Sequence, residues 1–68
     1  MKKTLLIEGM TCAHCQARVE KALNSLEDVK AKVNLKKSLA VVKSKVEIED
    51  SVLIEAVSEA GYKVVSIN

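Results

Sequence analysis

Two cysteines and one histidine, all within a single short stretch, are the side chains in this chain best suited to chemistry. They lie in the sequence Gly9-Met10-Thr11-Cys12-Ala13-His14-Cys15, and no other Cys or His is present. Two thiols at this spacing can bind a soft metal ion, cycle between dithiol and disulfide, or lie inert in a core. Inert burial fits least well, because the two cysteines flank a histidine in a polar loop.

The number of available ligands favours Cu(I) over zinc. A structural zinc site needs about four ligands, whereas this stretch offers two thiolates and at most one imidazole. Adjacent residues in a loop point in different directions, so we expect His14 to face solvent and Cys12 and Cys15 to be the ligands. Two thiolates alone suit Cu(I), which prefers sulfur. A surface site with so few ligands favours exchange, because an incoming thiolate can bind before an outgoing one leaves.

The composition is that of a small globular domain and excludes several functions. The chain has 68 residues and a net charge of +2, and we expect residues 1–68 to form a single domain. One Tyr and no Phe or Trp leave no aromatic platform on which bases could stack. The lysines are interspersed with glutamates and form no dense run, so we expect no nucleic-acid partner.

No segment of the chain predicts export or membrane insertion. Met1–Lys3 resembles the start of a signal peptide, but the apolar run Leu5–Ile7 stops at Glu8. A secretory segment needs roughly 7–15 apolar residues. We therefore expect a cytosolic protein. In that reducing compartment a pair of nearby cysteines is more often metal-binding or catalytic than a structural disulfide.

Alternating and helical patterns of apolar residues predict six elements that position the cysteine stretch. Residues 3–8 alternate in part, as a half-buried strand does, and Gly9 interrupts this pattern before a loop over 10–14. The remaining predicted elements are a helix from 15 to about 26, strands over 29–36 and 39–45 joined by a turn at 36–38, a helix from the N-cap Ser51 to Gly61, and a strand over 62–67.

The order β-α-β-β-α-β predicts an α+β fold, a ferredoxin-like βαββαβ sandwich in which two helices cover one face of a four-stranded antiparallel sheet. In this fold the loop after the first strand lies at one end of the sandwich. We therefore expect Cys12 to be exposed and Cys15 to lie in the first helical turn. Free backbone N–H groups and the positive end of the helix dipole favour a thiolate there, so at least one thiol should have a pKa below about 8.5.

The Gly9–Cys15 stretch, the order of elements and Gly61-Tyr62 resemble the heavy-metal-associated domain family, and within it the small bacterial copper chaperones. The resemblance covers essentially the whole chain. It implies that Cys12 and Cys15 bind Cu(I) and that Met10 packs beneath the loop. It also places three further residues around the metal site, namely Thr11, His14 and Tyr62.

The resemblance implies a carrier and not an enzyme. Its expected partners are the metal-binding domain of a copper-transporting P-type ATPase or a copper-responsive repressor, and it suggests a homodimer that forms with copper. Three alternatives stay open: an excised metal-binding domain of a copper ATPase, a mercury-binding relative, and a dithiol oxidoreductase. The last fits least, because thioredoxin-like enzymes hold a cis-proline against their cysteines and this chain has no proline.

Overall fold

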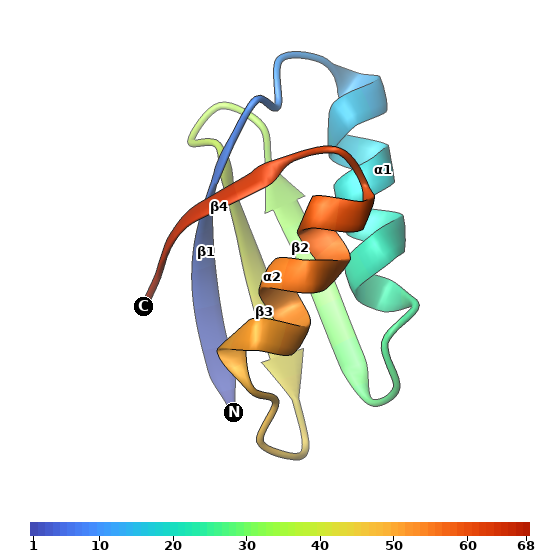
Figure 1. Ribbon diagram of the computed structural model, residues 1–68, viewed down its shortest axis with the longest axis vertical. Helices are drawn as coiled ribbons and strands as arrows, with labels where there is room; N and C mark the ends of the chain where they lie inside the picture. The colour runs from blue at the N-terminus through green and yellow to red at the C-terminus, as the bar shows by residue number, and fades with distance from the viewer.

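The computed structural model describes residues 1–68, and its elements follow the predicted order (Figure 1). The elements are β1 (Lys2–Glu8), α1 (Ala13–Asn24), β2 (Val29–Asn34), β3 (Leu39–Ser44), α2 (Asp50–Glu59) and β4 (Lys63–Ile67). The four strands form one antiparallel sheet in the order β2-β3-β1-β4, with both helices on one face, which confirms the predicted ferredoxin-like fold. Neither helix has the length and apolar composition of a membrane-spanning segment.

The first helix begins earlier than predicted. Its N-cap is Cys12, whose backbone is extended with φ −150° and ψ 171°, so α1 starts at Ala13 and not at Cys15. It also ends at Asn24, before the predicted end near Leu26. The predicted start was late because Ala13 and His14 are exposed and add nothing to the apolar stripe that marks the rest of the helix.

The second helix and the β2–β3 turn also correct the prediction. Glu49, not Ser51, is the N-cap of α2, and the Ser51 hydroxyl lies 3.5 Å from the Glu49 carboxylate. Strand β2 ends at Asn34, whose side-chain oxygen accepts a hydrogen bond from the Lys37 N–H at 3.1 Å. Ser38 then takes the left-handed conformation with φ 54°, which explains how this turn forms without glycine.

The core between the sheet and the helices is entirely apolar and contains no aromatic side chain. It confirms the predicted alternation, since Leu5 and Ile7 are buried whereas Leu6 is 41% exposed on the open face of the sheet. One loop residue, Met10, is part of it. The buried side chains are Leu5, Ile7, Met10, Val19, Leu23, Val29, Val33, Ala40, Val42, Leu53, Ala56 and Val57.

Three polar side chains of α1 tie the helix to the outer edge of β2. Gln16, Glu20 and Asn24 recur every fourth residue and so share one helix face. The Ala31 N–H donates to the Asn24 side chain at 2.8 Å, and the Asn24 amide donates back to the Ala31 carbonyl at 3.1 Å. The Val33 N–H donates to Glu20 and its carbonyl accepts from Gln16, both at 3.2 Å. These side chains satisfy backbone groups that a neighbouring strand would otherwise satisfy.

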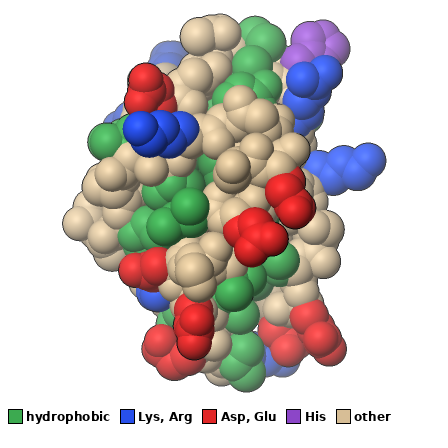
Figure 2. Space-filling view, viewed as in Figure 1, with side chains coloured by type: hydrophobic (Ala, Val, Ile, Leu, Met, Phe, Trp, Pro, Cys, Tyr) green, Lys and Arg blue, Asp and Glu red, His purple; other side chains and the backbone are tan.

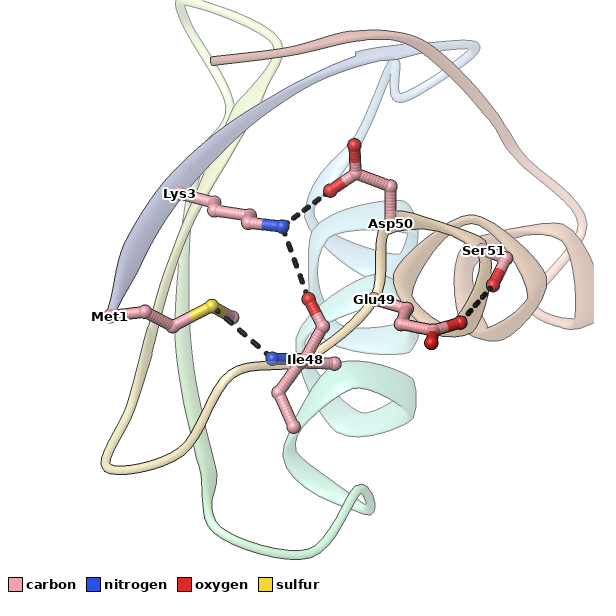
Figure 3. Close-up of polar contacts among 6 residues, drawn as sticks. All are labelled: Met1, Lys3, Ile48, Glu49, Asp50 and Ser51. Carbon is pink, nitrogen blue, oxygen red and sulfur yellow. Dashed lines mark hydrogen bonds and ion pairs between the residues drawn. The ribbon is translucent and has the colours of Figure 1, made fainter.

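The first residues of β1 hold the loop that leads into α2 (Figure 3). The Lys3 ammonium donates to the Ile48 carbonyl at 3.1 Å and pairs with the Asp50 carboxylate at the first residue of α2. The Ile48 N–H donates to the Met1 sulfur at 3.4 Å, and the Ile48 side chain packs against the core. The start of α2 is therefore fixed by the end of the sheet that lies away from the cysteine loop (Figure 1).

The tie between α1 and β2 predicts the effect of removing Asn24. Replacing Asn24 with Ala should lower the free energy of unfolding by about 1 kcal/mol, because two backbone groups of Ala31 lose their partner. Alanine is the better helix former, so any loss must come from these bonds. Urea unfolding followed by circular dichroism measures the change, with Lys21→Ala as the control on the same helix. An Asn24→Ala variant as stable as the control would show that water replaces the side chain without loss.

Candidate metal centre

The loop between β1 and α1 places both cysteines at one end of the sandwich (Figure 1). Gly9 has φ 96°, a left-handed conformation that glycine adopts without strain, and it turns the chain out of the sheet. Met10 then points inward and is only 5% exposed, so it anchors the loop to the core. Thr11 and Cys12 follow on the exposed side. The burial of Met10 thus anchors the loop to the core, while Thr11 and Cys12 stay accessible to solvent.

The two cysteine sulfurs lie 3.3 Å apart and both are free thiols. Cys12 is exposed at the N-cap, and Cys15 is half-buried in the first turn of α1. Since a metal–thiolate bond is about 2.3 Å long, one ion can contact both sulfurs at this separation. No group of three or more His, Cys, Asp and Glu side chains lies close enough to hold a metal ion. The donor set at this end of the molecule therefore consists of two thiols.

His14 does not join the cysteines. It lies in the first turn of α1, is exposed, and makes no side-chain hydrogen bond to either thiol. Figure 2 shows the histidine protruding from the surface of the molecule. This placement agrees with the expectation that His14 faces solvent.

Tyr62 reaches the site because of the way α2 ends. Ala60 is the C-cap, and Gly61 follows with φ 96°. The Gly61 N–H donates to the Ser58 carbonyl at 2.9 Å and the Tyr62 N–H to the Val57 carbonyl at 3.2 Å, which is the pattern of a Schellman motif. The chain then turns back toward the cysteine loop, where the Tyr62 ring lies beside Gly9.

The pKa of the Cys15 thiol is lowered to about 6 by groups that donate hydrogen bonds to its sulfur. The Tyr62 hydroxyl contributes most, followed by the backbone at Thr11 and the Cys12 thiol. The expectation of a low-pKa thiol is therefore met at Cys15, but its main cause is a tyrosine from the other half of the chain and not the helix terminus alone. Near neutral pH the Cys15 sulfur is a thiolate, the form that binds metal.

Arg18 acts on Tyr62 at this site, and the sequence analysis did not single it out. Hydrogen bonding to the Cys15 sulfur is the largest cause that raises the pKa of the Tyr62 phenol, whereas Arg18 acts in the opposite direction on the same hydroxyl. Arg18 lies three residues after Cys15, so the two share one face of α1. That spacing was the available signal, but its relevance is clear only once Tyr62 is known to be affected by both residues.

Comparison with known proteins places the whole site within one family. The sequence pattern of the heavy-metal-associated domain matches residues 4–63. The copper chaperone CopZ of Enterococcus hirae is 40% identical over 65 residues, which cover 93% of this chain and 94% of CopZ. A solved structure described as a CopZ metallochaperone superposes with a TM-score of 0.88 at 36% identity, covering 96% of this chain and all of that one.

A second kind of relative is a much larger protein. The copper-exporting P-type ATPase of Staphylococcus aureus is 45% identical over 64 residues. These cover 93% of this chain but only 8% of the ATPase. The chain is thus similar both to a small chaperone over its whole length and to one small part of a transporter.

The effect of Tyr62 on the Cys15 pKa predicts the pH dependence of Cys15 in the metal-free protein. Alkylation of Cys15 by iodoacetamide, followed by peptide mass spectrometry, should show a midpoint near pH 6, and Tyr62→Phe should move it toward the ordinary value of 9.0. Between these values the folded protein has lost a proton that the unfolded chain still holds, so stability should rise with pH. His14→Ala is the control. An unchanged midpoint in Tyr62→Phe would contradict the assigned cause.

Proposed function

The chain belongs to the heavy-metal-associated domain family, and from that premise we propose that it is a cytosolic copper carrier. It binds one Cu(I) ion through Cys12 and Cys15 and passes the ion on by thiolate exchange. The observation that carries this proposal is the pair of free sulfurs 3.3 Å apart on an exposed loop. The similarity to a copper chaperone, which extends over 93% of this chain and 94% of that relative, supports the proposal.

The choice of copper rests on the chemistry of the donors. Thiolates are soft ligands that select Cu(I), zinc and iron–sulfur clusters. A closed zinc site needs about four ligands, and no cluster of three or more His, Cys, Asp and Glu is present. The Cys15 thiolate forms without bound metal, with a pKa of about 6. The protein therefore offers one ready thiolate and a second thiol that loses its proton when the ion binds.

The role of carrier follows from the exposure of the loop. Cys12 is exposed, so an acceptor thiolate can approach the ion before either protein ligand leaves. An ion with two ligands has room for a third, which permits a shared intermediate. We propose that the ion leaves Cys12, which lies outside the helix, first, and leaves Cys15, whose pKa is lowered by Tyr62, last.

The acceptor in this proposal is the metal-binding domain of a copper-transporting P-type ATPase, with a copper-responsive repressor as a further recipient. The similarity to a segment of such an ATPase supports the first partner, since a domain of the same fold can present its own thiolates in the same way. A homodimer that shares copper between two loops uses the same geometry, with this chain as its own acceptor.

Removing one thiol should abolish tight copper binding. We expect one Cu(I) per chain in an anaerobic titration against a chromophoric chelator, and a loss of affinity of at least about a hundredfold in Cys12→Ser or Cys15→Ser. His14→Ala should bind as the parent does, because His14 lies away from the sulfurs. Zn(II) should bind far more weakly than Cu(I). Wild-type affinity in Cys12→Ser would place the site elsewhere.

Transfer kinetics distinguish a carrier from a dithiol oxidoreductase. The copper-loaded protein should pass Cu(I) to a Cys-x-x-Cys domain of a copper ATPase much faster than copper dissociates into an excess of a chelator that cannot contact the loop. The same protein should reduce the disulfides of insulin no faster than free dithiol. Rapid insulin reduction, together with copper transfer no faster than dissociation, would reverse the assignment.

A further inference from the structure

We propose that the open face of the sheet binds an anionic lipid surface through a row of lysines. The row consists of Lys30, Lys43 and Lys2, which lie side by side on neighbouring strands. Lys43 of β3 is directly opposite Lys30 of β2 on one side and Lys2 of β1 on the other. All three side chains are exposed. The proposal does not rest on the proposed function, because it requires no metal.

Such a row is unfavourable in the isolated protein. Side chains directly opposite each other in an antiparallel sheet are about 4.5–5.5 Å apart at Cβ, and like charges there destabilise the pair. No carboxylate relieves the repulsion, since the single ion pair in the structure joins Lys3 and Asp50 on the helix side. An anionic surface laid against the row would supply the missing counter-charge.

The surroundings of the row extend the positive face. A shallow hollow on this side of the sheet is lined by the row together with Lys32 and Lys36, and its apolar lining includes Leu39 and Val41. The hollow is lined by five lysines and no acidic residue. The helix side differs, because Figure 2 shows acidic side chains gathered there among apolar ones. The hollow therefore carries only positive charge, whereas the groove between the helices is lined by both basic and acidic side chains.

The chemistry of this face favours a lipid surface over a protein or a nucleic acid. It carries no arginine, the residue that binds carboxylate and phosphate groups with a fixed fork of donors. It also carries no aromatic side chain, which protein interfaces use as anchors and single strands use for stacking. Clustered lysines without directed donors match a diffuse negative potential, which attracts each positive charge independently of geometry.

The position of the row leaves the cysteine loop free. Lys2 begins β1, whereas Gly9 and the cysteines follow the end of the same strand. A strand of this length spans about 23 Å. Contact through the lysine row therefore keeps both thiols at the far end of the molecule, with the helices facing away from the lipid.

Sedimentation with vesicles tests the proposal. The metal-free protein should bind vesicles of phosphatidylglycerol at low ionic strength, should not bind vesicles of phosphatidylcholine, and should dissociate as salt is added. Lys43→Glu should weaken binding about 25-fold, at about fivefold for each of two charge units. The matched control, Lys21→Glu, makes the same change in net charge on α1 beside the groove between the helices and should bind nearly as the parent does.

Folding is controlled within the same experiment. Lys43→Glu places a carboxylate opposite Lys2 and Lys30, so its thermal unfolding temperature should not fall. Lys43→Gln gives a second variant, with an expected loss of about fivefold. Absence of binding to phosphatidylglycerol, equal binding to both lipids, or an equal loss in Lys21→Glu and Lys43→Glu would each overturn the proposal. So would tighter, Lys43-dependent retention on duplex DNA, which would assign the face to nucleic acid.

Discussion

The effect of the Tyr62 hydroxyl on the Cys15 thiol links the two halves of the chain at the cysteine loop, where the Tyr62 ring lies beside Gly9. It is the largest cause that lowers the pKa of Cys15. It exists only because Gly61, which follows the C-cap of α2, has a left-handed backbone that turns Tyr62 back toward the loop. The other end of α2 is held by Lys3 from the first strand (Figure 3). A thiolate in the first half of the chain therefore depends on where a helix in the second half is placed.

The loop itself is a compromise between anchoring and exposure. Met10 is buried in the core, while Cys12, two residues later, is open to solvent. The copper carrier proposed above needs both, since a flexible loop would bind its ion weakly and a buried loop could not release it. The burial of Met10 anchors the loop, whereas Cys12 lies outside α1 at its N-cap and Cys15 lies within its first turn.

The sequence predicted the order of elements, the exposed Cys12 and the solvent-facing His14, because alternation and helical spacing are local signals. It did not predict the start of α1, since cysteine is not among the residues that typically cap helices. Arg18 was missed because its relevance depends on Tyr62, which is distant in sequence. The lysine row was missed for the same reason. Lys2, Lys30 and Lys43 are scattered along the chain, and only the register of three strands aligns them.

The side chains of Gln16, Glu20 and Asn24 along the edge of β2 bear on aggregation. A sheet with bare edges can recruit a strand from another molecule and grow into a fibre. Here the side chains of α1 already bond backbone groups along the edge of β2. This edge therefore becomes available to another strand only if α1 detaches. The opposite edge is the short β4, and its pairing with β1 shifts register between Leu6 and Ile7. An irregular edge of this kind is a poor template for a further strand. Neither edge of the sheet therefore offers a regular template for edge-to-edge polymerisation.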